Sequence, residues 1–387
     1  MNHSDAMTSA RKRRSGSKWK PYTTAALLAA GALITCALLN RRTARKAERD
    51  NPPSGKFVRV NGVRLHYVER GHGEPLVLLH GNGSMIQDFE TSGLIEAAAR
   101  TYRVIVFDRP GYGHSERPRS TVWTAEAQSN LFHAALGKLG VTRAIVLGHS
   151  WGASVAVALA LRHPEAVAGL VLASGYYYPT VRSDVALLSG PAVPVIGDIL
   201  RYTISPVLGR MIWPLLLRKV FGPSPMPAKF NGFPVEMALR PSTIRASAAE
   251  SALMIPSAAA ARSHYGRLRM PVAIIAGEAD RIVDTDRQSA RLHGEVPQST
   301  FDHVPGAGHM IHQTATARVM SAIDAASGRA PRSSETQGGA NGGVNSWSGP
   351  IGSRNDESRD PSGIGLSFDR IHILALAAAR KSGFTTG

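Results

Sequence analysis

The stretch Ala144-Ile-Val-Leu-Gly-His-Ser-Trp-Gly152 decides the fold of this chain. It begins with an apolar, β-branched run that is typical of a buried strand, and small helix-forming residues follow over 153–161. The pattern Gly-x-Ser-x-Gly between a strand and a helix is a nucleophile elbow, in which a sharp turn lifts the serine hydroxyl clear of the sheet. The two glycines leave room for the strained backbone of that turn. We therefore predict that Ser150 is a nucleophile, placed beside a helix N-terminus that favours developing negative charge.

A serine is a weak nucleophile that needs a general base and a carboxylate to orient that base. Downstream of the elbow, a predicted strand over residues 271–277 is followed by Asp280, and another over residues 299–304 is followed by His309. The order Ser150, Asp280, His309 is the one in which a serine at such an elbow meets its partners. Asp280 and His309 are therefore the predicted acid and base. The alternatives left open are Asp284 for the acid and His303 or His312 for the base.

An oxyanion hole is expected where an upstream strand over residues 76–79 runs into His80-Gly81-Asn82-Gly83. Backbone N–H groups in such a loop can bind the negative oxygen of a tetrahedral intermediate. The expected donors are the N–H group of Asn82 or Gly83 and that of Trp151, the residue after the nucleophile. His80 and His149 are expected to shape these loops rather than to act as bases.

Five motifs, taken together and in this order, resemble those of the α/β-hydrolase-fold serine hydrolases. They are His80-Gly-Asn-Gly83, Asp108-Arg-Pro-Gly-Tyr-Gly-His-Ser115, the elbow at Ser150, Gly277-Glu-Ala-Asp280 and Gly306-Ala-Gly-His309. The resemblance extends over residues 56–326 and points to the lid-bearing esterases and to relatives similar to epoxide hydrolases and haloperoxidases. It implies that residues 108–115 shape the surroundings of the site. It says little about the substrate, because the fold hosts many chemistries.

The rest of the sequence predicts an α/β protein with a doubly wound, mostly parallel sheet, because strands alternate with helices. Asn61-Gly62 between two short alternating runs predicts a hairpin at the start of a hydrolase domain over residues 56–327. Residues 179–268 lack strand alternation, which predicts a helical cap over the active site. Ten Lys/Arg against four Asp/Glu make this cap basic. Its apolar run over residues 202–221 is expected to be a buried face of the cap, the alternative being a surface that touches lipid.

An uncharged, Ala- and Leu-rich run over residues 23–39 lies between basic flanks. Seventeen helical residues span about 26 Å, enough for a thin hydrocarbon core. We predict a basic segment over residues 1–22, a single-pass transmembrane signal anchor over residues 23–40 and a linker over residues 41–55. A cleaved signal peptide is the rival, but no small-residue cleavage site is evident. Basic residues on both sides of the run leave the orientation in the membrane open.

The formal charge of +17 on 387 residues raises the question of nucleic-acid binding. Residues 1–50 hold eleven Lys/Arg and three Asp/Glu, so much of the excess belongs to the membrane-anchor region. No nucleic-acid-binding motif accompanies the charge, and we predict no such partner. Cys36 is the single cysteine, which excludes an intrachain disulfide. The Gly-, Ser- and Asn-rich residues 328–387 predict a disordered tail.

These observations predict a serine hydrolase that cleaves a carboxylic ester or related acyl compound through an acyl-enzyme. The expected substrate is a small, apolar acyl compound, and no cofactor or metal is expected. Dehalogenase and epoxide-hydrolase chemistry is disfavoured, because those relatives carry a carboxylate where this chain has Ser150. The same triad leaves open a proline-iminopeptidase-like amidase, a cofactor-free perhydrolase and an acyltransferase. A non-catalytic receptor on this fold is the alternative of a different class.

Overall fold

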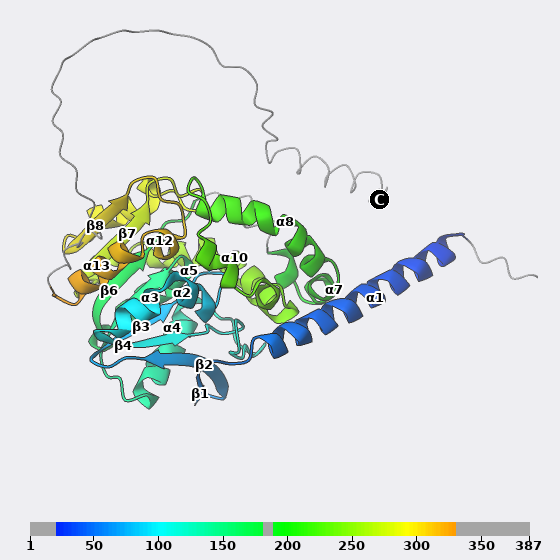
Figure 1. Cartoon of the computed structure of the whole chain (residues 1–387), viewed down its shortest axis with the longest axis horizontal. Helices are drawn as coiled ribbons and strands as arrows, with labels where there is room; N and C mark the ends of the chain where they lie inside the picture. The colour runs from blue at the N-terminus through cyan, green and yellow to red at the C-terminus, as the bar shows by residue number, and fades with distance from the viewer. Residues whose placement is uncertain (1–20, 181–188, 330–387) are drawn as a thin grey trace, which may run out of the picture. The chain divides into compact units, whose positions relative to one another are not determined.

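The computed structural model describes residues 21–180 and 189–329 (Figure 1). The expected disordered tail and the expected basic N-terminal segment lie outside these residues, apart from 21–22 and 328–329. Within the described part, an eight-stranded sheet has the order β1-β2-β4-β3-β5-β6-β7-β8. The strands are β1 (Lys56–Val60), β2 (Val63–Arg70), β3 (Glu74–Leu79), β4 (Tyr102–Phe107), β5 (Ala144–His149), β6 (Val167–Ala173), β7 (Val272–Gly277) and β8 (Ser299–Val304).

The sheet is mostly parallel, as predicted. β1 and β2 form an antiparallel hairpin, β2 pairs antiparallel with β4, and the remaining neighbours are parallel. The predicted hairpin turn is confirmed: Asn61 and Gly62 have φ values of 49° and 82°, and Val60 pairs with Val63. Positive φ at both turn residues matches the twist of the flanking strands, which is why Asn-Gly is favoured there.

Helices cover both faces of the sheet. Alternate side chains of a strand point to opposite faces, and in the central strands both sets are apolar and must be buried. In β3, Val77 and Leu79 pack in the core beneath α4 (Ala125–Lys138) and α5 (Trp151–Arg162). Leu76 and Leu78 pack in the second core. The helices on that second face are α2 (Ile86–Ser92), α3 (Leu94–Ala99) and α13 (Thr316–Ala326). The central strands are therefore buried on both faces, as a doubly wound sheet requires.

The cap segment contains helices and no strand among its described residues. Its α-helices are α7 (Ile196–Tyr202), α8 (Ile204–Phe221), α9 (Val235–Ala238) and α10 (Pro241–Ala261). Two further short helices, α11 (Arg291–Glu295) and α12 (Ile311–Thr314), flank β8. After His309 the chain forms α12 and then α13, which are separated at Ala315 by a φ of −136° and a ψ of 47°.

The N-terminal helix is longer than the sequence suggested. α1 runs over Pro21–Asp50, so it continues through most of the residues that we assigned to a linker. These residues are strong helix formers, since they are mainly Arg, Ala, Lys and Glu. Ala47 is buried against the cap, and Glu48 forms an ion pair of 2.8 Å with Arg240 at the start of α10. Packing on the cap therefore extends the helix.

Candidate active site

Ser150 lies at the turn between β5 and α5 with φ 54° and ψ −119°. Such a backbone conformation is strained for a residue with a side chain and is found at functional sites. The flanking glycines permit it: a Cβ on Gly148 would lie 2.3 Å from the carbonyl oxygen of Gly152, and one on Gly152 would lie 2.1 Å from that of Leu79. The structure thus has the tight turn that the sequence pattern predicts.

The expected acid and base are in contact. Nδ1 of His309 lies 2.7 Å from Oδ2 of Asp280, and both side chains are buried. The other oxygen of Asp280 accepts the backbone N–H groups of Ile282 at 2.8 Å and Val283 at 3.0 Å. Because these two N–H groups hold one oxygen of the carboxylate, its other oxygen fixes the orientation of the His309 imidazole. Nε2 of His309 is then the ring nitrogen that can accept a proton.

The loop that carries His309 meets the elbow through His149. Nε2 of His149 lies 3.1 Å from the backbone oxygen of His309, and the two rings are 5.0 Å apart. Ser150 Oγ and His309 Nε2 share no direct hydrogen bond in this structure. Catalytic hydrogen bonds are often long in free enzymes and shorten when substrate binds. The structure brings Asp280 and His309 together, and the loop that carries His309 contacts the residue before Ser150.

The rival acid and bases make other contacts. Asp284 is exposed and accepts the backbone N–H of Arg287 at 2.9 Å. His303 is exposed in β8. His312 is buried, with Nε2 2.9 Å from a carboxylate oxygen of Asp88. Burial would raise the pKa of Asp88, but His312 lowers it below its usual range. The His312 ring lies 4.4 Å from the ring of His149, and its Nε2 is engaged by Asp88.

The loop expected to complete the oxyanion hole lies against the nucleophile. A Cβ on Gly81 would lie 3.2 Å from Cβ of Ser150, so the backbone there comes close to the elbow. Gly83 has φ +71°, which favours glycine. On the other side, Trp151 is the first residue of α5, and N–H groups in the first turn of a helix have no partner within the helix. Both expected donor segments therefore border Ser150.

His80 shapes this loop. Its Nδ1 lies 2.8 Å from the carbonyl oxygen of Gly81, and its Nε2 accepts the backbone N–H of Arg109 at 3.0 Å. Burial and the positive charge of Arg109 lower the pKa of His80 to about 4. The imidazole is therefore neutral near pH 7, and both of its nitrogens are engaged. This geometry fits the structural role expected for it.

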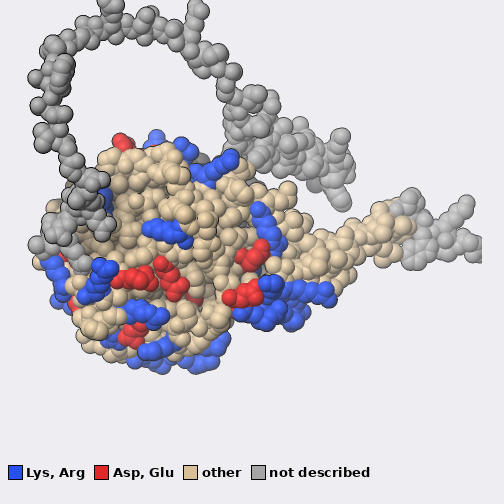
Figure 2. All heavy atoms as spheres, viewed as in Figure 1, with Lys and Arg blue, Asp and Glu red and all other residues tan. Residues whose placement is uncertain are grey.

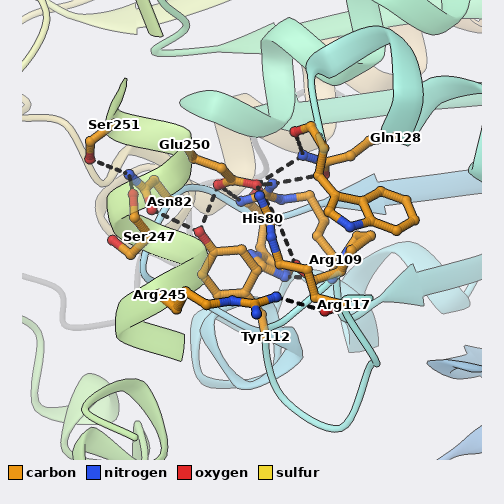
Figure 3. A network of polar contacts seen from close by, with 12 residues as sticks. His80, Asn82, Arg109, Tyr112, Arg117, Gln128, Arg245, Ser247, Glu250 and Ser251 are labelled. Carbon is orange, nitrogen blue, oxygen red and sulfur yellow. Dashed lines mark hydrogen bonds and ion pairs between the residues drawn. The ribbon is translucent and has the colours of Figure 1, made fainter. Parts of the chain in front are cut away.

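A buried polar network joins the oxyanion loop to the cap (Figure 3). Its centre is Glu250 of α10, which forms an ion pair with Arg109 and accepts a hydrogen bond from Gln128 at 2.9 Å. Arg109 also donates to the carbonyl oxygens of His80 at 2.7 Å and Gly81 at 2.8 Å. Burial would raise the pKa of Glu250, but Arg109 lowers it, so the carboxylate is charged. A cap helix is thus tied to the backbone of the oxyanion loop.

Asn82 belongs to the same network. Its Nδ2 donates to the carbonyl oxygen of Ser247 at 3.2 Å and to Oγ of Ser251 at 3.1 Å, both in α10. The Tyr112 hydroxyl lies 2.8 Å from Oδ1 of Asn82 and 2.7 Å from Oε2 of Glu250. A hydroxyl has one proton, so Tyr112 can donate to one of these acceptors at a time or share its proton between them. The side chain of Asn82 therefore serves to hold the loop under the cap, which leaves its backbone N–H as the expected oxyanion donor.

Replacing Glu250 by alanine should destabilise the protein by about 3–5 kcal/mol, because it leaves the buried guanidinium of Arg109 without the carboxylate that balances its charge. The matched control is Glu236→Ala, which removes a half-exposed cap glutamate that pairs with Arg210 at 2.7 Å. An exposed pair contributes about 0–1 kcal/mol. Thermal unfolding of the three proteins should show a drop of about 10 °C for Glu250→Ala. Similar melting temperatures for the two variants would contradict this account.

Two groups of side chains among the described residues have the atom types that bind metals. Asp88, His149 and His312 place their ligand atoms within 4.8 Å of one another, as do His133, His163 and Glu165. In the first group, the carboxylate of Asp88 already accepts from Ser84 at 2.9 Å and from Gln313 at 3.0 Å, besides His312. We interpret this group as a hydrogen-bonded part of the core.

Comparison with known proteins decides the family. The model of the alpha/beta hydrolase fold family matches residues 74–316, which is more than half of the chain. The chain belongs to the α/β hydrolase fold family. The match extends from β3 to the start of α13 and so contains the elbow, the His309 loop and the cap. The family prediction is confirmed.

Curated relatives of this α/β hydrolase match only about a third of its chain. A 2-hydroxymuconate semialdehyde hydrolase of Pseudomonas sp. strain CF600 is 32% identical over 136 residues, which are 34% of this chain and 48% of the relative. A 2-hydroxy-6-oxononadienedioate/2-hydroxy-6-oxononatrienedioate hydrolase of Paraburkholderia phymatum is 37% identical over 152 residues, 35% of this chain and 52% of the relative. The chain thus spans about half the length of the curated relatives it matches. Haloalkane dehalogenase 2 of Mycobacterium tuberculosis is 30% identical over 116 residues, 30% of this chain and 40% of the relative.

Solved structures share the fold of this α/β hydrolase. A thermophilic esterase from Thermogutta terrifontis has a TM-score of 0.57 at 22% identity, covering 70% of this chain and 97% of the esterase. A bacterial membrane phospholipase A has a TM-score of 0.55 at 21% identity, covering 79% of this chain and 97% of that chain. At this level of identity the likeness extends to the fold alone.

Proposed function

We propose that this α/β hydrolase cleaves a carboxylic ester through an acyl-enzyme on Ser150. The observation that carries the proposal is the strained serine at the elbow, which the Gly81 backbone borders. The preceding residue, His149, contacts the backbone of His309, whose side chain forms a buried pair with Asp280. A serine at this place supports acyl transfer, because its alkoxide forms an ester that water can hydrolyse. The carboxylate that the disfavoured dehalogenase chemistry would require is absent from position 150.

The reaction has two steps. His309 Nε2 takes the proton of the Ser150 hydroxyl as its oxygen attacks the carbonyl carbon, and the resulting imidazolium is stabilised by Asp280. Backbone N–H groups of Trp151 and of Asn82 or Gly83 bind the oxyanion, an effect worth about 3–4 kcal/mol for a donor. His309 then protonates the leaving alcohol. In the second step His309 activates water, which releases the acid and restores the serine.

The alternative acyl-transfer activities share this machinery. Amide hydrolysis, perhydrolysis and transfer to an alcohol differ in the leaving group or in the nucleophile that attacks the acyl-enzyme. Because a curated relative is a 2-hydroxymuconate semialdehyde hydrolase, the substrate panel should contain that compound beside esters and anilides. The assay uses full-length protein in detergent. A kcat/KM for that compound higher than for every ester would replace the proposed ester hydrolysis with the activity named for the relatives.

The substrate that we propose is apolar. Each additional CH₂ group buried in an acyl pocket should contribute about 0.8 kcal/mol, or roughly fourfold in binding. We therefore expect kcat/KM for p-nitrophenyl esters to rise from acetyl to hexanoyl or octanoyl and then to level off. Initial rates at substrate concentrations well below KM measure this series directly. A preference for acetyl or charged acyl groups would refute the apolar substrate and leave the serine mechanism standing.

We further propose that α1 anchors the enzyme in a membrane as a single-pass helix. Its Tyr22–Asp50 part has a window of mean hydropathy 1.8 that is not buried against the rest of the protein. A cleaved signal sequence passes the same test, but here the helix continues into residues that pack on the cap. Asn40 Nδ2 donates to the carbonyl oxygen of Thr203 at 2.7 Å, and Glu48 pairs with Arg240. Cleavage near residue 40 would remove part of this contact.

Membrane fractions should retain the enzyme after a wash with 1 M salt, an ionic strength at which the Debye length is about 3 Å. Electrostatic attraction between the basic flanks and anionic lipid is screened under these conditions, whereas insertion of an apolar helix is not. Immunoblots of supernatant and pellet make the measurement, with detergent extraction as the positive control. Release by salt, or a mature N-terminus near residue 40, would rule out the anchor.

A further inference from the structure

The apolar run of the cap faces outward. The apolar sequence of residues 202–221 predicts a buried face of the cap, and for one side of α8 this prediction is wrong. The exposed side chains recur at helical spacing: Ile204 (50% exposed), Val207 (42%), Leu208 (51%), Met211 (73%), Ile212 (39%) and Leu215 (49%). An amphipathic helix of a water-soluble protein presents the opposite pattern, with its apolar stripe toward the core.

The outward apolar surface is larger than this stripe. Between residues 193 and 217, every residue in the exposed class is apolar or, in one case, Tyr202. Ile196 and Ile199 extend the surface over α7, at 61% and 53% exposure. We call residues 193–217 the outer cap face. A contiguous apolar patch formed by so many large side chains marks a contact with another apolar phase, because monomeric soluble proteins rarely expose one.

The outer cap face adjoins the apolar part of α1. The corner between α7 and α8 is fixed to that helix: the carbonyl oxygen of Thr203 accepts Asn40 Nδ2 at 2.7 Å and Cys36 Sγ at 3.1 Å. Nη1 of Arg210 in α8 donates to Oδ1 of Asn40 at 3.2 Å. The corner where α7 meets α8 accordingly lies beside the middle of α1 (Figure 1). The contact is at the carboxyl end of the uncharged run, where a bilayer surface would be.

Basic residues lie directly after the part of α1 that contacts the corner between α7 and α8. The next turns of α1 carry the exposed residues Arg41, Arg42, Arg45 and Lys46. Figure 2 shows Lys and Arg gathered at the base of α1 and a surface without charged residues farther out along the described helix. Apolar side chains bordered by Lys and Arg are typical of a protein surface that lies in the interface of an anionic bilayer.

We propose that the outer cap face is a second membrane contact, immersed in the interface of the bilayer that α1 spans. The proposal rests on the proposed anchor and deepens it. It also connects the bilayer with the active site. At the far end of α8, the carbonyl oxygen of Val220 accepts the backbone N–H groups of His309 at 3.0 Å and Met310 at 3.3 Å. One helix therefore runs from the membrane contact to the His309 loop.

Site-directed fluorescence tests the contact in the full-length protein. Cys36 is the single cysteine, so Cys36→Ser gives a background for labels at one position each. Environment-sensitive NBD labels are placed at Met211→Cys in the outer cap face, at Leu28→Cys in α1 and, in α13, at Ala317→Cys, which replaces an exposed residue. The proteins are reconstituted in vesicles of phosphatidylcholine and phosphatidylglycerol, with and without doxyl-labelled lipid.

We expect blue-shifted emission and doxyl quenching at residues 28 and 211 and neither effect at residue 317. Quenching at residue 28 without quenching at residue 211 would overturn the cap contact and leave the anchor intact. Quenching at residue 211 alone would support the cap contact and refute the anchor. If neither position were quenched, both proposals would fail.

A kinetic test uses a charge in the outer cap face. Met211→Asp should lower the rate on a long-chain ester embedded in vesicles several-fold and leave the rate on a short soluble ester unchanged, because an ionised carboxylate resists immersion. Val122→Asp is the matched control, since Val122 is 70% exposed but lies outside this face. Equal losses for the two variants, or no loss for Met211→Asp, would contradict the membrane contact.

Discussion

Ser150→Ala should reduce kcat for ester hydrolysis by about 10⁶, the effect found for nucleophile removal in a serine hydrolase whose triad acts as a unit. The alanine removes the attacking oxygen and nothing that holds the fold, since the turn depends on the backbone and on Gly148 and Gly152. Stopped assays on purified full-length protein in detergent measure the loss. Circular dichroism melting curves check that the variant is folded.

His309→Ala should give a loss of similar size, and the double variant should be no worse than either single variant. Non-additivity of this kind distinguishes a nucleophile and its base from two residues that contribute separately. Ester hydrolysis retained by folded Ser150→Ala would end the serine mechanism. Additive losses would mean that His309 is not the base of Ser150.

Asp280→Asn should lower kcat by about 10⁴, as for the wrong imidazole tautomer in a serine protease. The contacts of Asp280 explain why. One carboxylate oxygen accepts the N–H groups of Ile282 and Val283, so the amide oxygen of an asparagine would take that place. The amide NH₂ would then face Nδ1 of His309 and force it to accept. Nε2 would carry the proton and could not take one from Ser150.

Asp284→Asn is the matched control, because Asp284 lies four residues away and also accepts a backbone N–H group, that of Arg287. Its side chain is 53% exposed, and we expect a change of less than about threefold, as for a surface substitution of up to about 0.5 kcal/mol. The ratio of the two kcat values is the measurement. Equal losses, or a larger loss for Asp284→Asn, would move the acid to Asp284.

Much of the fold could be predicted because its signals are local. The strands of the sheet core are continuous apolar runs, which a sheet covered on both faces requires. The elbow is decided by Gly148, Ser150 and Gly152, whose spacing has a steric cause that the structure displays. The Asn61-Gly62 hairpin follows from backbone conformations that few residue types adopt. In each case the residues that form the sequence pattern are the same residues that form the turn or strand.

The contacts between cap and core could not be predicted, because they join distant parts of the chain. Glu250 is separated by 141 residues from Arg109, and neither position reveals its partner. A signal was nevertheless present: Glu250 is a lone carboxylate in the Ala- and Ser-rich α10. A carboxylate that becomes buried with the apolar side of a helix needs an oppositely charged partner. Its presence in this helix therefore indicates a buried cation nearby.

The direction of the apolar side of α8 was also beyond the sequence. Periodicity shows that the apolar residues share a face but does not show whether protein or lipid covers it. Exposure in the folded chain shows that the described part of the protein does not cover it. The same holds for α1, where helix propensity favoured continuation beyond residue 40 but the packing of Ala47 and the ion pair of Glu48 were needed to see it.

Reaction with a fluorophosphonate tests the central claim most directly, because this reagent phosphonylates a serine that a neighbouring base has activated. Full-length enzyme in detergent is treated with the probe, digested and analysed by tandem mass spectrometry, with Ser150→Ala and heat-denatured enzyme as controls. We predict one adduct, located on Ser150, that appears in step with the loss of esterase activity and is absent from both controls. Esterase activity that survives the probe, or an adduct at another residue whose formation abolishes activity, would contradict the claim that Ser150 is the nucleophile.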